Sequence, residues 1–104
     1  MSRSIKDEFT DQLFDAILML RNREECYNFF EDIATISEIK ALGQRLEVAK
    51  MLRTGATYEE IVEKTGVSTA TISRVKRSLY YGADGYNLIL DRMGIREEEG
   101  KNKS

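Results

Sequence analysis

The chain contains no proline, no histidine and a single cysteine. Without proline and with few glycines, little interrupts helices, so the many Leu, Ile, Glu, Lys and Arg residues favour an all-α fold. The one cysteine, Cys26, excludes an internal disulfide, and its apolar surroundings favour a packing role. No apolar run reaches the 18 residues of a membrane span and no signal peptide is recognisable, so we expect a cytoplasmic protein without membrane contacts.

The chain has no histidine, so catalytic mechanisms that need a histidine are excluded. No cluster of cysteine or histidine has metal-ligand spacing, and no glycine-rich phosphate loop follows a strand. Paired carboxylates, such as Asp7 with Asp11, fall on helix faces that we expect to be solvated. The sequence therefore predicts no enzyme, no metal site and no cofactor.

Net charge is −2, which argues against a general polyanion binder, but the charge is unevenly distributed. Residues 1–35 hold eight acids and four bases, residues 36–56 two acids and four bases, and residues 68–81 three bases and no acid. A basic middle is consistent with phosphate contacts through one face. The alternative is that these charges only solvate helix faces.

Residues 57–81, TYEEIVEKTGVSTATISRVKRSLYY, are the most informative stretch. Thr57 and Glu60 have the spacing of a capping box, so a helix should begin there. Gly66 can supply the left-handed C-cap of that helix, and Ser68 can cap the next one. Two short helices joined by a glycine turn are typical of a helix-turn-helix, whose second helix enters the major groove of DNA. The alternative is an ordinary antiparallel helix pair in an all-α core.

The second of these helices has two kinds of face. Helical spacing predicts that its inward side consists of Ala70, Ile72, Val75 and Leu79. The polar and basic residues left for its other faces, which are the candidates for DNA contact, are Ser68, Thr69, Thr71, Arg74, Lys76 and Arg77. Small hydroxyls followed by cations suit a helix that enters a groove.

The N-terminal third is more apolar than a small monomer requires. Its first predicted helix carries Ile5, Phe9, Leu13, Phe14, Ile17, Leu18 and Leu20. Asn22 can cap a second helix, whose apolar residues are Cys26, Phe29, Phe30 and Ile33. This breadth predicts a homodimer through residues 5–33. The alternative is that these faces cover the protein's own core.

A third helix is expected to begin at the capping box of Thr35 and Glu38 and to end before Thr54-Gly55. Its predicted apolar stripe is Ile36, Ile39, Leu42, Leu46 and Ala49. At the end of the stretch 57–81 we expect a turn over residues 80–85. One more short helix should follow the turn. One domain over residues 1–95 is predicted, with residues 1–4 frayed and residues 96–104 a disordered tail.

Two segments carry a family resemblance. The run ALGQRLEVAKMLRTG at 41–55, followed by EEIVEKTGVSTATISRVKRSL at 59–79, resembles the trp repressor superfamily. The flanks LFDAILMLRNREECYNFFEDIATISEI and SLYYGADGYNLIL are similar to the YerC/YecD type of TrpR-like protein. The resemblance implies about six helices in an intertwined homodimer that binds double-stranded operator DNA. It also implies that Thr69, Ala70 and Thr71, which match the start of the recognition helix, approach base edges.

The resemblance further implies a possible effector pocket. Its residues are Thr35, Arg45, Arg74, Val75 and Ser78, of which the two arginines match those that enclose the indole of a tryptophan corepressor. Val75 stands where the family has a glycine that leaves room for the ring. We therefore expect that L-tryptophan is not the effector. Glu59, which replaces a base-contacting arginine, leaves the operator sequence open.

The sequence as a whole predicts a DNA-binding transcriptional regulator, with repression through a palindromic operator as its mode of action. One alternative is a protein–protein interaction module that retains the fold without operator binding. Another is the related helix-turn-helix of replication initiators, which would be attached to a larger ATPase chain.

Overall fold

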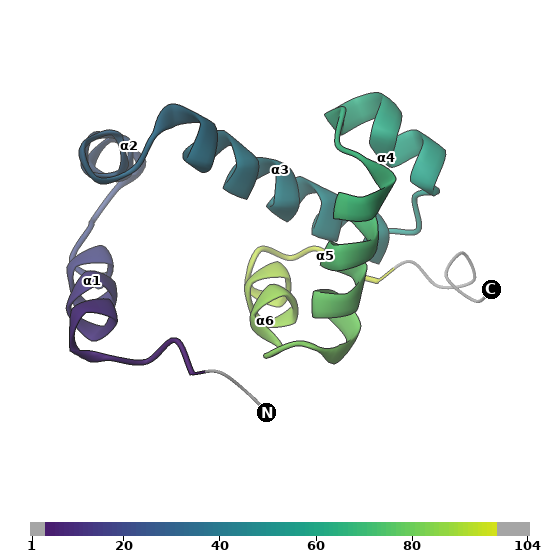
Figure 1. Cartoon of the computed structure of the whole chain (residues 1–104). Helices are drawn as coiled ribbons and strands as arrows, with labels where there is room; N and C mark the ends of the chain where they lie inside the picture. Colours follow the sequence, from purple (N-terminus) through teal and green to yellow (C-terminus); the bar gives the residue numbers. More distant parts are fainter. Residues whose placement is uncertain (1–3, 98–104) are drawn as a thin grey trace. The chain divides into compact units, whose positions relative to one another are not determined.

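The computed structural model describes residues 4–97, and this part of the chain forms six α-helices and no strand (Figure 1). They are α1 (Glu8–Leu18), α2 (Arg23–Ile33), α3 (Ile36–Arg53), α4 (Tyr58–Thr65), α5 (Thr69–Tyr81) and α6 (Gly85–Arg92). The predicted all-α class and the number of helices are confirmed. Residues 1–3 and 98–104, which hold most of the predicted frayed end and tail, lie outside the described residues.

Side-chain caps set the starts of several helices, as the sequence predicted. The Thr35 hydroxyl accepts a hydrogen bond from the Glu38 amide at 3.1 Å, and the Glu38 carboxylate accepts one from the Thr35 amide at 2.8 Å. Thr57 and Glu60 make the same reciprocal pair at 3.1 and 2.7 Å. Asn22 caps α2 through the amide three residues on. Each cap satisfies amides that have no partner within the helix.

The chain divides into two compact units, Met1–Ile39 and Lys40–Ser104, with the boundary inside α3. None of the described residues of the first unit is buried. Phe9 and Leu18 of α1 are 81% and 82% exposed. Other large apolar side chains with more than half of their surface exposed in this unit are Ile5, Met19, Tyr27, Ile33 and Ile36. The first unit therefore presents apolar helix faces that no core of its own covers.

The second unit contains the buried core of the described chain. Its buried side chains are Val48, Ala49 and Leu52 of α3, Ile61 of α4, Ile72, Val75 and Leu79 of α5, and Leu90 of α6. In Figure 1, α5 follows α4 after a short turn and α6 runs beside α5. This core fixes the helix-turn-helix against α3 and α6.

Three residues of the apolar faces predicted for α3 and α5 are exposed, one on α5 and two on α3. Ala70, expected on the inward side of α5, is exposed. It lies two residues before Ile72 and so about 200° around the helix from the buried arc, at 100° per residue. Ile36 and Leu42 of the predicted α3 stripe are also exposed, because the buried side of α3 is formed farther along, at Val48, Ala49 and Leu52.

The predicted turn after the second helix of the pair also needs a correction. Tyr80 and Tyr81 belong to the last turn of α5, and the chain leaves the helix only at Gly82. A Cβ on Gly82 would lie 2.5 Å from the Ser78 carbonyl oxygen, so the glycine permits this close exit. Asp84 then adopts a left-handed conformation, with φ of 71°, before α6 begins.

Candidate nucleic-acid interface

The helix-turn-helix has the local geometry that its sequence predicted. α4 ends at Thr65, and Gly66 turns the chain with a φ of 75°, a conformation that glycine adopts without a Cβ penalty. Ser68 then caps α5, its hydroxyl accepting from the Thr71 amide at 3.1 Å. The turn thus presents the first residues of α5 at a fixed angle to α4.

The side chains predicted to contact DNA divide into two groups. Thr69, Ala70, Arg74, Lys76 and Arg77 are exposed along α5. Ser68 and Thr71 form the cap of the helix, and the Ser68 hydroxyl donates to the Thr71 hydroxyl at 3.2 Å. Contact between these residues and nucleic acid remains a prediction; the structure brings them together on one helix and at its start.

Among the described residues, no carboxylate pairs with the arginines of α5. In residues 4–97, no ion pair engages Arg74 or Arg77, and α5 itself has no acidic residue. By contrast, Lys64 pairs with Glu47 at 2.9 Å. A basic helix face without carboxylate partners is available to phosphate groups.

Tyr58, the first residue of α4, was not identified from the sequence. Its hydroxyl lies 3.5 Å from the Ser73 hydroxyl, and the Lys76 ammonium lies 5.7 Å from the centre of its ring. The two residues it meets on α5 are 15 and 18 positions away in the chain, so no helical spacing rule connects them. The only signal was an aromatic residue directly after the Thr57 cap.

α3 holds the C-terminal end of α4. The Gln44 side-chain amide donates to the Thr65 carbonyl at 3.3 Å, beside the Lys64–Glu47 ion pair. These contacts satisfy a carbonyl in the last turn of α4, which has no partner within the helix.

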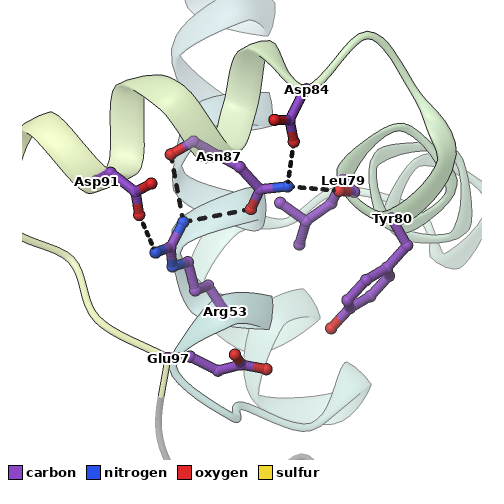
Figure 2. A pocket seen from close by; sticks show the side chains of 7 residues that line it. All are labelled: Arg53, Leu79, Tyr80, Asp84, Asn87, Asp91 and Glu97. Carbon is purple, nitrogen blue, oxygen red and sulfur yellow. Dashed lines mark hydrogen bonds and ion pairs between the residues drawn. The ribbon is translucent and has the colours of Figure 1, made fainter.

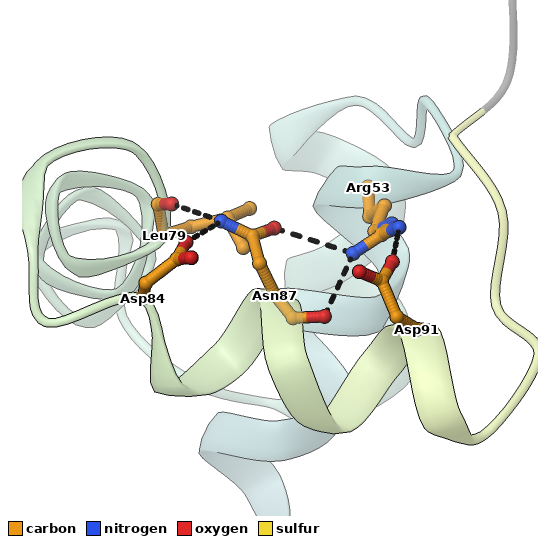
Figure 3. A network of polar contacts seen from close by, with 5 residues as sticks. All are labelled: Arg53, Leu79, Asp84, Asn87 and Asp91. Atoms are coloured by element: carbon orange, nitrogen blue, oxygen red, sulfur yellow. Dashed lines mark hydrogen bonds and ion pairs between the residues drawn. The ribbon is translucent and has the colours of Figure 1, made fainter.

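A second polar network holds the C-terminal end of α5 (Figure 3). The Asn87 side-chain amide donates to the Leu79 carbonyl and to the Asp84 carboxylate, both at 2.9 Å. Arg53 donates to the Asn87 side-chain oxygen at 3.2 Å and pairs with Asp91. Arg53 therefore joins α3 to α6, and Asn87 joins α6 to α5.

This network lines a hollow of about 300 Å³. The residues around it are drawn in Figure 2. Its walls are Arg53, Leu79, Tyr80, Asp84, Asn87, Asp91 and Glu97. Two of its three carboxylates bond to other wall residues, as does the guanidinium. The described residues contain no group of cysteine, aspartate and glutamate that could hold a metal ion. The bonds around the hollow join α3, α5 and α6 to one another.

The residues of the possible effector pocket do not share one environment. Arg45, Arg74 and Ser78 are exposed, whereas Val75 is 3% exposed and belongs to the core of the second unit. The Thr35 hydroxyl and amide are engaged in the capping box of α3. Val75 thus occupies space beneath α5 from the protein's own side, as its sequence position suggested.

A glycine-turn helix pair with a basic second helix defines a helix-turn-helix protein with the fold of DNA-binding regulators. The chain belongs to the Trp repressor protein family, whose model matches residues 8–94. This confirms the predicted resemblance, and the family is one of regulators and not of enzymes.

Relatives and solved structures agree with this assignment. The uncharacterized protein YerC of Bacillus subtilis (strain 168) is 59% identical over 93 residues, 89% of this chain and 89% of YerC. A crystal structure of a Staphylococcus aureus protein assigned to the Trp repressors matches with a TM-score of 0.86 and 57% identity, covering 90% of this chain and 94% of that one. A TrpR-like protein from Eubacterium eligens ATCC 27750 has the same TM-score and identity, covering 90% and 97%.

Within residues 4–97, no helix has both the length and the apolarity needed to span a bilayer.

Proposed function

We propose that the protein is a homodimeric, sequence-specific DNA-binding regulator of transcription that acts in the cytoplasm, with α5 as its recognition helix. The observation that carries this proposal is the exposed basic face of α5, where Arg74 and Arg77 have no ion pair among the described residues. Thr69 and Ala70 stand at the start of the same helix, where small side chains allow close approach to base edges. Phosphate contacts position such a helix, and base contacts select the sequence.

Dimerisation is part of the proposal, because the first unit has no buried residue in its described part. A second copy packed against residues 5–33 would cover the apolar faces of α1 and α2. A two-fold dimer presents two recognition helices about 34–36 Å apart and so reads a palindrome. We propose repression as the mode of action, since a dimer bound across a promoter excludes polymerase.

We further propose that DNA binding does not require L-tryptophan. Val75 already packs beneath α5. In the last turn of α4, the Thr65 carbonyl accepts a hydrogen bond from Gln44 of α3. In the last turn of α5, the Leu79 carbonyl accepts one from Asn87 of α6. A recognition helix held in this way needs no ligand to order it.

Selection of bound sequences from a random duplex pool, followed by mobility-shift titration of the selected duplex, tests the proposal. We expect the selected sequences to share a palindromic consensus. The logarithm of the binding constant should fall linearly with the logarithm of the salt concentration. Arg77→Ala should weaken binding to all duplexes and reduce the salt slope by about one, because one phosphate contact is lost. The matched control is Arg92→Ala, which removes an exposed arginine from α6 and should leave the slope unchanged.

The second candidate function is a protein–protein interaction module. The observation that favours it is the acidic surface of α4, where Glu59 and Glu63 are exposed, together with the net charge of −2. Under this alternative, selection enriches no sequence, and Arg77→Ala changes nothing in the binding assay. The two outcomes separate the candidates.

A further inference from the structure

Tyr58 of α4 contacts α5 and so connects the two helices of the helix-turn-helix. Its half-buried ring packs against the core, and its hydroxyl lies 3.5 Å from Ser73 of α5. The Lys76 ammonium lies 5.7 Å from the centre of the ring. Ser73 and Lys76 are three residues apart and so neighbours on one face of α5. One aromatic ring thus contacts two adjacent side chains of the proposed recognition helix.

A lysine side chain has four flexible methylene groups, and ordering them on binding costs conformational entropy. An ammonium group held over an aromatic face is attracted by the ring quadrupole, so it is partly ordered before binding. The ring occupies one side of the ammonium, and Lys76 is otherwise exposed, so its N–H donors remain accessible.

We propose that Tyr58 is a positioning residue, whose ring holds Lys76 in place for contact with a nucleic-acid phosphate. This inference rests on the proposed function, since it assumes that α5 binds a duplex. It adds a residue of α4 to an interface otherwise formed by α5. Tyr58 acts through Lys76, so the predicted effect of removing its ring is the loss of the Lys76 contact.

The competing explanation is that Tyr58 only packs α4 against the core. Two substitutions separate these roles: Tyr58→Phe keeps the ring, and Tyr58→Leu keeps apolar bulk without it. For Tyr58→Phe we expect an affinity for the selected duplex within about twofold of the native protein. For Tyr58→Leu and for Lys76→Ala we expect losses of about three- to tenfold, with the salt slope reduced by about one because one phosphate contact is lost.

A double-mutant cycle supplies the readout that a packing role would not change. Tyr58→Leu should have no further effect on affinity or salt slope in the Lys76→Ala background, because the contact it supports is already absent. Additive losses in the double variant, or an unchanged slope in Tyr58→Leu, would overturn the proposal. Thermal unfolding of each variant shows whether Tyr58→Leu folds.

A measurement on the free protein distinguishes failure of this inference from failure of the proposed function. The ε-methylene protons of Lys76 should be shifted upfield by the ring in native protein and in Tyr58→Phe. Absence of that shift in the folded native protein overturns the inference even if DNA is bound and Tyr58→Leu does not fold. If the shift is present but the native protein binds no duplex, the proposed function fails and the positioning role falls with it.

Discussion

The side-chain amide of Asn87 donates a hydrogen bond to the carbonyl of Leu79 at 2.9 Å, across the corner between α6 and α5. Leu79 belongs to the last turn of α5, where carbonyls have no partner within the helix. The same Asn87 side chain accepts from Arg53 of α3. One half-buried amide therefore connects the end of the proposed recognition helix to two other helices.

Asn87→Ala should lower the free energy of unfolding by about 1–3 kcal/mol, because it leaves the Leu79 carbonyl without its side-chain donor and removes one acceptor of the Arg53 guanidinium. Urea titration at a fixed protomer concentration measures this, since the stability of a dimer depends on concentration. Arg92→Ala, an exposed change on the same helix, is the control and should stay within about 0.5 kcal/mol of the native protein. Equal stability of the two variants would mean that the network contributes nothing.

Gly66→Ala should destabilise the helix-turn-helix by about 1–2 kcal/mol, because the left-handed conformation at φ of 75° is unfavourable for a residue with a Cβ. No atom lies within 4 Å of the added Cβ, so the cost comes from the backbone alone. The control is Gly43→Ala inside α3, where the Cβ is also free of contacts. That change should raise stability by about 0.5–1 kcal/mol. A Gly66→Ala protein as stable as the native one contradicts the geometry of the turn.

Phe9→Lys should dissociate the proposed dimer, because it places a charge on an apolar face that a second copy would cover. Sedimentation velocity at micromolar concentration should show a dimer for the native protein and a smaller species for the variant. Gln12→Lys adds the same charge at an exposed polar position of α1 and should remain dimeric. A folded native monomer at micromolar concentration would rule out an obligate dimer.

Glu38 has a pKa below its ordinary value of 4.5, chiefly because the Thr35 backbone amide donates to its carboxylate, with the Thr35 hydroxyl adding to the effect. A carboxyl group whose pKa is lower in the folded than in the unfolded protein stabilises the fold at pH values above its pKa in the unfolded protein. This stabilisation is lost as the pH falls through the folded value. We therefore expect the cap of α3 to weaken below pH 4.5, and Glu38→Gln to lack this part of the pH dependence. A carboxyl NMR titration with a midpoint at or above 4.5 contradicts the expectation.

Local hydrogen bonding explains which features could be predicted from the sequence. The caps at Thr35 and Thr57 join residues three positions apart, and Gly66 acts through its own backbone, so each could be identified without knowledge of the fold. Asn87 and Arg53 are 34 positions apart, and their contact depends on how α3 and α6 pack. Tyr58 and Lys76 are likewise brought together only by the packing of α4 on α5.

Helical periodicity predicted that α3 and α5 have apolar faces, but it could not determine how far each face is covered. Leu42 continues the stripe of α3 and is exposed, because burial depends on which neighbouring helices reach that turn. Ala70 is small enough to fit either face, so its apolarity carried little information about its direction. These errors, and that at Ile36, arise where tertiary packing, and not local pattern, decides burial.

L-tryptophan should not bind the native protein at low micromolar strength, although Arg45 and Arg74 are both present. Val75 is 3% exposed in the core beneath α5, so an indole inserted there would have to displace its isopropyl group. Overpacking of this kind costs about 1–3 kcal/mol, which is roughly five- to 150-fold in affinity. Titration calorimetry with the native protein tests the expectation.

Val75→Gly should create or improve tryptophan binding, because it removes the side chain that fills the site. Glycine in a helix costs about 1 kcal/mol relative to alanine, and the lost core contacts add to that, so circular dichroism must first show that the variant is folded. In folded Val75→Gly, the further change Arg74→Ala should abolish the new binding, because this arginine would lie against the indole. Low-micromolar binding by the native protein would refute the argument, as would a folded Val75→Gly protein with no gain at all. Binding in Val75→Gly that persists without Arg74 would instead place the ligand elsewhere.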